Sequence, residues 1–587
     1  MIETKQVYDV VVIGCGGGGL RSAIGAAQKG ARTLVIGAGK VNRSGATLLA
    51  GANISADVAC DGASLARLGI SDSNKNDTKE AWFEDVVHEG FYLNNQKLLE
   101  LFVNTASDRL EELMQWGMKI RGMEGDREIS VFGSDILDAL YTRAKELHVD
   151  FVGDNMFCDL VVERGTVCGV VCLDLISGQL HHYPARAVIL ATGGAHNLFP
   201  SNSGSTELCG SGQAAALRAG AELTDMEMIS FCPTVMTNPV MYKGNILPYI
   251  LFSTGYGRLL NKYGKTFTHR YLSAHVEQLA LDTEWNKMLL SYALQSEILN
   301  GRGNMHGGIY YTLDLHPTDL QDELYADLPP LKTGIYADIM KIFAGDRAVT
   351  VQPAAHYFEG GVRVNDKMET CVPGLYAAGE CTGGLFGANR VSAATTEMLV
   401  EGARAGDSAG LYAREADWIQ ASPDTLAFLE EELLRPLERN DGVRPQDALD
   451  QLHHIVGDAL TVIRSGERLN QGMRLLDEFM STNLPNLFCQ DKSRVYNHQL
   501  RESIQLRDMA LVAQAILLSA DARKESRGVH VRSDYLVTDN CNFIKNTVVD
   551  PKTLQVRLED TVLTRMEPEK VKLSYVDYIE QIVGQLQ

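Results

Sequence analysis

The stretch YDVVVIGCGGGGLRSAIGAAQKGARTLVIGAG, residues 8–39, constrains the fold more than any other part of the chain. Its β-branched start predicts a strand buried on both faces, and the small residues that follow predict a helix leading into a second strand, TLVIG. Gly14, Gly16 and Gly19 place a GxGxxG pattern at the turn from strand to helix. There, free backbone amides and the helix N-terminus can face a pyrophosphate. The stretch therefore predicts a βαβ unit that binds a dinucleotide.

One element of such a site is missing. A carboxylate usually follows the glycines by about twenty residues and binds a ribose hydroxyl, but this position falls near Gly37. Another residue must take that role. The later segment YAAGE ends in Glu380, which offers a carboxylate at the end of a predicted strand.

The order of the remaining segments predicts four domains, because 587 residues are too many for one core. Strand-like and helix-like segments alternate, an aromatic-rich and irregular region interrupts them, and helical and then short strand-like segments follow. We predict an α/β nucleotide-binding domain over 1–226 and 347–410, an inserted capping domain over 227–346, a helical domain over 411–530 and a small C-terminal domain over 531–587.

Composition excludes several classes of function. The net charge of −21 argues against a nucleic-acid partner, which requires a surface that neutralises phosphates. The 11 cysteines form no CxxC pair, so we expect reduced, packed thiols and no metal site. No apolar run approaches the ~18 residues that span a bilayer, and no secretory signal is present. We expect a cytoplasmic protein that reaches the inner face of the cell membrane only through partner subunits.

Further motifs identify a family. The combination of GxGxxG, ATGG at 191–194 and GLYAAGE resembles two-dinucleotide-type flavoproteins that bind FAD. The segments RSGATLLAGA (43–52), AAHYFEGGVRV (354–364), VPGLYAAGECTGGLFGANRVSAATTEML (372–399) and RKESRGVHVRSDY (523–535) are similar to the flavoprotein subunits of succinate dehydrogenase and fumarate reductase. Relatives of this family include L-aspartate oxidase and adenylylsulfate reductase. The resemblance runs in order over essentially the whole chain.

The resemblance implies an α/β fold in which a two-dinucleotide-type FAD-binding domain carries an inserted α+β capping domain, a helical domain and a small C-terminal domain. It implies that FAD is the cofactor and that the acid of the AAGE motif, here Glu380, holds a ribose. The FAD contacts that it implies are Gly14, Gly16, Gly19, Ser44, Gly45, Gly51, Ala191, Thr192, Gly193, Glu380 and Thr395.

One departure concerns the attachment of FAD. The membrane-bound succinate dehydrogenases have an RSHT segment whose histidine bonds covalently to the flavin, whereas this chain has Gly45 in RSGAT. We therefore expect non-covalent FAD. In the family the covalent bond favours succinate oxidation, so its absence favours catalysis in the reductive direction.

Two residues of the family's substrate site have counterparts in this chain. The resemblance implies that Arg390 of GANR clamps a substrate carboxylate and that His356 of AHY helps to hold it. A planar guanidinium can bind a carboxylate through two parallel hydrogen bonds. The polarised substrate then presents an adjacent C=C bond that accepts hydride from flavin N5.

Other residues of that site are altered. Cys232 replaces the histidine of FHPT, and it is a nucleophile, a redox thiol or a small residue that shapes the pocket. Lys287 falls where fumarate reductases have their proton-donating arginine. Burial near Arg390 would lower its pKa toward working pH, although a solvated helix residue is the other interpretation. The family's threonine-glutamate pair has no clear counterpart in PYILFSTGYGRLLN.

Three hypotheses follow. The first is an FAD-dependent oxidoreductase acting on the CH–CH group of a small carboxylate, with Arg390, His356, Lys287 and Cys232 in its active site. The second is chemistry like that of adenylylsulfate reductase, whose version of RSGA is the most similar. The third is a flavin that only relays electrons within a complex. An iron-sulfur subunit is the expected electron partner, and an oxidase that works alone is the alternative.

Overall fold

The computed structural model describes residues 2–56, 77–124, 127–247, 250–253, 255–314, 322, 324–325, 332 and 334–586. Its largest sheet has eight strands in the order β7-β3-β2-β10-β9-β8, and β1 and β17 also pair with β10. The strands are β1 (Glu3–Thr4), β2 (Tyr8–Ile13), β3 (Thr33–Ile36), β7 (Asp150–Val152), β8 (Asn155–Glu163), β9 (Thr166–Asp174), β10 (Leu180–Leu190) and β17 (Leu375–Ala377).

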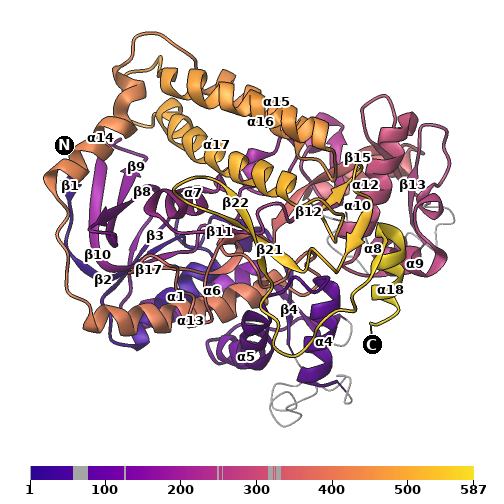
Figure 1. Ribbon diagram of the computed structural model, residues 1–587, viewed down its shortest axis with the longest axis horizontal. Coiled ribbons are helices and arrows are strands. Elements are labelled where there is room, and N and C mark those ends of the chain that lie inside the picture. The colour runs from indigo at the N-terminus through magenta and orange to yellow at the C-terminus, as the bar shows by residue number, and fades with distance from the viewer. Residues whose placement is uncertain are drawn as a thin grey trace.

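Helices α1 (Gly17–Gln28) and α13 (Ala394–Glu415) pack side by side near this sheet (Figure 1). Small residues allow their close approach. A Cβ atom on Gly406 would lie 2.1 Å from the carbonyl oxygen of Ser22, so a larger residue would force the two helices apart. The alternation of strands and small-residue helices thus produces the expected nucleotide-binding layer.

A second sheet carries the capping region at the other end of the molecule (Figure 1). Its antiparallel strands run in the order β12-β15-β14-β13. The strand β15 begins within the range that we assigned to the second part of the nucleotide-binding domain, and its partner β12 lies in the capping range. The elements here are β12 (Ile229–Asn238), β13 (Gly257–Leu260), β14 (Ile309–Leu313), β15 (Val349–Phe358), α8 (Ile250–Ser253), α9 (Ala274–Asp282), α10 (Asn286–Glu297) and α12 (Gly334–Ala344).

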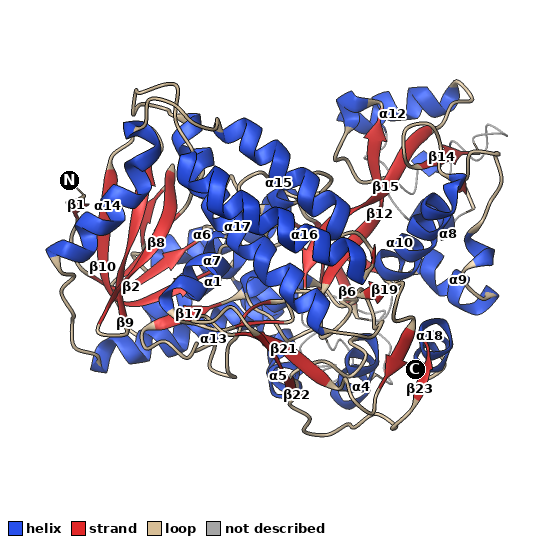
Figure 2. Cartoon of the chain, turned by 45° about the horizontal axis from the view of Figure 1, so that its top comes forward, coloured by secondary structure: helices blue, strands red, loops and turns tan. Residues whose placement is uncertain are grey.

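The long helices of the C-terminal half lie across the nucleotide-binding region (Figure 2). They are α14 (Pro423–Glu438), α15 (Pro445–Ala459), α16 (Gly466–Glu478) and α17 (His498–Ala522). The chain then forms short strands and ends in α18 (Tyr575–Val583). The sequence pattern had indicated only strands there, but Tyr575, Tyr578, Ile579 and Ile582 recur at helical spacing and are all buried.

Further elements complete the described structure. They are α2 (Ala46–Leu49), β4 (Gly51–Ser55), α4 (Lys79–Glu89), α5 (Gln96–Gln115), β5 (Gly122–Glu124), β6 (Glu128–Phe132), α6 (Gly133–Glu146), η1 (His196–Leu198), α7 (Ser211–Ala219), β11 (Leu223–Thr224), η2 (Val240–Tyr242), η3 (Thr268–Arg270), η4 (Ile298–Arg302), β16 (Gly361–Val362), η6 (Gly379–Cys381), β18 (Ile463–Arg464), η7 (Phe479–Asn483), η8 (Leu484–Asn486), β19 (Val531–Arg532), β20 (Val537–Asp539), β21 (Lys545–Val549), β22 (Val556–Asp560) and β23 (Lys572–Ser574).

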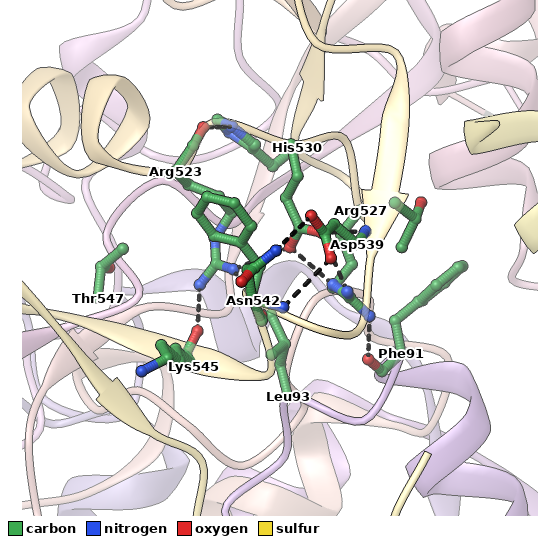
Figure 3. Close-up of polar contacts among 12 residues, drawn as sticks. Phe91, Leu93, Arg523, Arg527, His530, Asp539, Asn542, Lys545 and Thr547 are labelled. Atoms are coloured by element: carbon green, nitrogen blue, oxygen red, sulfur yellow. Dashed lines mark hydrogen bonds and ion pairs between the residues drawn. The ribbon is translucent and has the colours of Figure 1, made fainter. Parts of the chain in front are cut away.

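Buried arginines of the RKESRG segment, residues 523–528, join the C-terminal region to the rest of the molecule (Figure 3). The Arg523 side chain is fully buried; its Nε donates to Glu227 Oε1 at 2.6 Å and its Nη2 to the carbonyl oxygen of Lys545 at 2.6 Å. Arg527 donates to Glu525 and, over 3.1 Å, to the carbonyl oxygen of Phe91. The bonds to Glu227 and Phe91 connect segments that are hundreds of residues apart in the sequence.

Two findings concern the described residues only. None of their helices is both long enough and apolar enough to cross a membrane. None of their histidine, cysteine, aspartate and glutamate side chains gather in threes with a geometry that could hold a metal ion.

Candidate functional site

Three glycines shape the turn between β2 and α1. Gly14 has a φ of +112°, and a Cβ atom there would lie 2.1 Å from the carbonyl oxygen of Ala191. A Cβ atom on Gly19 would lie 1.8 Å from the carbonyl oxygen of Gly14. Gly16 caps α1 and leaves its first turn open, where the N–H of Gly17 meets Thr47 Oγ1 at 3.2 Å. Only glycine fits the two close contacts, and the N-terminus of α1 suits a pyrophosphate.

The end of β10 brings the ATGG segment beside the same turn. The N–H of Ala191 donates to the carbonyl oxygen of Ile13 at 2.8 Å. Thr192 Oγ1 bonds to Cys381 Sγ at 3.3 Å, and Gly193 turns with a φ of +71°. Because these residues border the GxGxxG turn, they can line one wall of an extended nucleotide site.

Glu380 lies behind this wall, with 13% of its side chain exposed. Its Oε1 accepts the N–H of Phe358 at 3.2 Å and lies 3.6 Å from His196 Nε2. The same oxygen is 2.7 Å from the position of a Cβ atom on Gly194. Burial raises the pKa of Glu380. Its assignment to a ribose remains a prediction.

The RSGATLLAGA segment leads from this turn toward α13. Ser44 Oγ lies 3.5 Å from Cys15 Sγ, and Gly45 has a φ of +84° with open space where a Cβ atom would be. Gly51 begins β4 and pairs with Phe132. Further along, Thr395 Oγ1 donates to the carbonyl oxygen of Asn53. The segment therefore connects the nucleotide turn with the start of α13.

Arg390 is the best-defined cation of the candidate active site. Its side chain is 6% exposed and its guanidinium lies 4.5 Å from the centre of the Tyr357 ring. Nη1 donates to the carbonyl oxygen of Ser392 at 3.0 Å. Among the described residues Nε has no hydrogen-bond partner, and neither has either amide atom of the neighbouring Asn389. Buried polar atoms normally have partners, so these atoms fit a site that receives a polar ligand.

His356 and Lys287 lie near Arg390. His356 is on β15 and its Nδ1 bonds to Ser203 Oγ at 2.8 Å. Burial, with the charges of Lys287 and Arg390, lowers the pKa of His356 well below its usual range, so the imidazole is neutral. Lys287, near the start of α10, pairs with Glu284. The structure thus brings all four predicted catalytic side chains, including Cys232, into one electrostatic environment.

Lys287 is not the solvated helix residue of the alternative interpretation, because it is 6% exposed. Burial and the charge of Arg390 lower the pKa of Lys287 to about 7. Cys232, Glu128 and Glu359 raise the pKa of Lys287 and offset part of this shift. An ammonium group with a pKa of about 7 can donate a proton at neutral pH.

Cys232 is on β12, directly beside β15, and pairs with Ala354. Its side chain is buried, and burial raises the pKa of its thiol. A protonated thiol is a weak nucleophile. The environment therefore favours the interpretation in which Cys232 shapes the pocket. In the neighbouring PYILFSTGYGRLLN stretch, residues 248–249 and 254 lie outside the described residues.

Motif analysis missed a group of buried acids behind Arg390. Tyr357 donates its hydroxyl hydrogen to Glu397, whose pKa is raised well above its usual range by burial and by Glu401. Glu401 accepts from the N–H of Gly379 and from Thr382, each at 2.8 Å. The AHY motif could have drawn attention to Tyr357. The sequence contains no signal that its partner is Glu397.

Two family models match this chain, and together they cover most of it. Residues 9–396 match the FAD binding domain, and residues 449–576 match the fumarate reductase flavoprotein C-terminal domain. The chain is therefore an FAD-binding flavoprotein, and the glycine turn and adjoining ATGG wall fit that cofactor. It belongs to the family of fumarate reductase and succinate dehydrogenase flavoprotein subunits, which confirms the resemblance and the predicted fold class.

Individual relatives support the assignment to this family. The fumarate reductase flavoprotein subunit of Mycobacterium tuberculosis is 31% identical, with 96% of this chain and 98% of that protein covered. The 8-methylmenaquinol:fumarate reductase flavoprotein subunit of Wolinella succinogenes is 29% identical over 96% of this chain and 92% of that protein. The structure of Mycobacterium smegmatis Sdh1 in complex with UQ1 superposes with a TM-score of 0.82 at 28% identity, covering 97% and 96% of the two chains.

A more distant likeness shows the fold alone. Adenosine-5-phosphosulfate reductase in complex with sulfite is 18% identical, with a TM-score of 0.76 over 97% of this chain and 98% of that one. The expected relationship to that enzyme is thus confirmed at the level of fold. Its chemistry does not follow from this similarity.

Proposed function

We propose that this protein reduces the C=C bond of a small unsaturated carboxylate, such as fumarate, with non-covalent FAD. The observation that carries the proposal is the buried cation Arg390 next to neutral His356 and to Lys287, whose pKa is about 7. This set combines a carboxylate clamp with a proton donor. When bound, FAD supplies a hydride at N5.

Each side chain has a separate role. Arg390 binds the substrate carboxylate through its guanidinium fork and holds it in a nearly dry site. Neutral His356, oriented by Ser203, hydrogen-bonds the same substrate. One alkene carbon gains the hydride, and Lys287 gives its ammonium proton to the other, so that the saturated acid leaves and Lys287 is neutral until it takes up a proton again.

The role of Lys287 predicts a pH dependence. Since its pKa is about 7, the protonated form is lost as pH rises through 7, and the reductive rate should fall about tenfold per pH unit above it. Lys287→Met should lower the rate by about 10²–10⁴-fold and flatten this profile. Steady-state rates between pH 5.5 and 9 test this. A variant with an unchanged alkaline limb would assign the titration to another group.

The attachment of FAD gives a second prediction. Gly45 has no side chain that could bond to the flavin, and its φ of +84° suits glycine. Acid precipitation of the protein is therefore expected to release the FAD into the supernatant, measured by its absorbance. Yellow colour that stays with the pellet would contradict non-covalent binding.

The substrate class is tested by turnover. The purified protein is supplied anaerobically with reduced viologen dye, and dye oxidation is followed with fumarate, with other unsaturated carboxylates and with adenylylsulfate. We expect oxidation with an unsaturated carboxylate and formation of the saturated acid. Oxidation with adenylylsulfate alone would favour the second hypothesis, and oxidation with none would favour the electron-relay role.

We also propose an iron-sulfur protein subunit as the electron partner. Two of the relatives described above are named as flavoprotein subunits. Electrons would then reach the flavin from the partner, and any attachment to the inner face of the cell membrane would come through such subunits. Purification from the native source, followed by the visible spectrum, tests this: iron-sulfur absorbance should co-purify with the flavin.

A further inference from the structure

The thiol of Cys15 fills the space where a side chain at position 37, the usual place of the ribose-binding acid, would lie. Gly37 follows β3 directly, and a Cβ atom on it would lie 2.5 Å from Cys15 Sγ. A side chain at this position would have to displace the thiol. Any carboxylate at the end of β3 must therefore come from another segment.

Glu207 supplies such a carboxylate. It lies between η1 and α7, and its Oε1 is 2.8 Å from the position that a Cβ atom on Gly39 would take. Ser44 Oγ is 3.0 Å from the same point. The Glu207 side chain is half-buried, and within the described part of the chain its carboxylate has no hydrogen-bond or ion-pair partner.

We propose that Glu207 holds the ribose hydroxyls of the adenosine half of FAD. The end of the second strand is where a dinucleotide fold places this carboxylate, and the two oxygens of one carboxylate can accept both hydroxyls of a ribose. Ser44, beside Gly39, is placed to contact the same sugar. The conventional residue is thus replaced by one that is about 170 positions later in the chain but close in space.

Glu380 occupies a different place. Its carboxylate is beside Gly194 and 3.6 Å from His196 Nε2, and it already accepts the N–H of Phe358. Glu207 lies instead beside the segment that follows β3. The proposal therefore separates the two acids: Glu207 serves the adenosine ribose, and Glu380 is left for another part of the cofactor.

Binding measurements on the full-length protein, stripped of FAD and titrated by flavin fluorescence, test the proposal without any substrate. The probes are FAD and its analogue with a 2′,3′-dideoxyadenosine group. The wild type should bind the analogue about tenfold more weakly than FAD, as expected for the loss of hydrogen bonds to a charged group. Glu207→Gln should bind FAD about tenfold more weakly and should no longer discriminate between the two probes.

Asp154→Asn is the matched control, because the N–H of Asp154 donates to the carbonyl oxygen of Gly39 and its acid lies in the same region. This variant should keep both the affinity and the discrimination. The proposal is overturned if the wild type binds both probes equally, if Glu207→Gln still discriminates, or if Asp154→Asn or Glu380→Gln removes the discrimination instead.

Discussion

Arg390→Ala is expected to lower the rate of substrate reduction by about 10²–10³-fold, while the protein keeps its FAD. The guanidinium is the only fork of donors that we assign to the substrate carboxylate, and its loss leaves that charge unpaired in a buried site. Arg390→Lys keeps the charge without the fork. It should therefore recover part of the rate and show a raised KM.

Arg404→Ala is the matched control, because Arg404 is on α13 and exposed to solvent. Its rate should equal that of the wild type. FAD content, from the flavin absorbance per protein, separates a loss of chemistry from a loss of cofactor. A fully active Arg390→Ala protein would remove Arg390 from the active site.

Arg523→Met is expected to destabilise the protein by about 3–5 kcal/mol. The guanidinium is fully buried, bonds to Glu227, and lies 3.9 Å from Asp225. Without it, Asp225 and Glu227 lose the guanidinium that neutralises both of their carboxylates. Burial and the neighbouring Glu227 already raise the pKa of Asp225 to about 7 in the native protein.

The sign of the pH effect follows from that pKa. Because the folded-state pKa of Asp225 lies above its unfolded value, the folded state binds the proton more tightly, and stability is lost as pH rises from about 4 toward 7. The Arg523→Met substitution should therefore lower the free energy of unfolding more at pH 8 than at pH 6. Denaturant titrations at both values test this. Arg444→Ala, which breaks an exposed pair with Asp447, should leave the stability nearly unchanged at both values.

Local features of the sequence predicted much of the fold. The turn at Gly14 and Gly19 was predictable because steric demands within a few residues require glycine there. Helix α18 was not, because its strand-like neighbours β20 and β23 obscured the helical spacing of its buried residues. The pairing of β12 with β15 was also not predictable from pattern, because the two strands are more than a hundred residues apart and their pairing is decided by packing at long range.

The residues of the candidate site also include some that the sequence predicted and some that it did not. Arg390 and His356 were predicted from motifs, and their roles stay predictions until variants are measured. No motif pointed to a role for Glu207 or Glu397, although Glu397 is within the 372–399 segment, because each lies beside residues that are far away in sequence. The Glu207 carboxylate meets the segment after β3 only because the η1–α7 loop folds back onto it. Contacts of this kind appear only in the folded chain.

The central claim is that the flavin of this protein delivers a hydride to an unsaturated carboxylate. Rapid anaerobic mixing of the chemically reduced protein with fumarate tests it most directly, with flavin absorbance as the signal. We predict fast reoxidation that Arg390→Ala abolishes and that yields one saturated acid per flavin. A flavin that stays reduced with fumarate and with other small unsaturated carboxylates would contradict the claim.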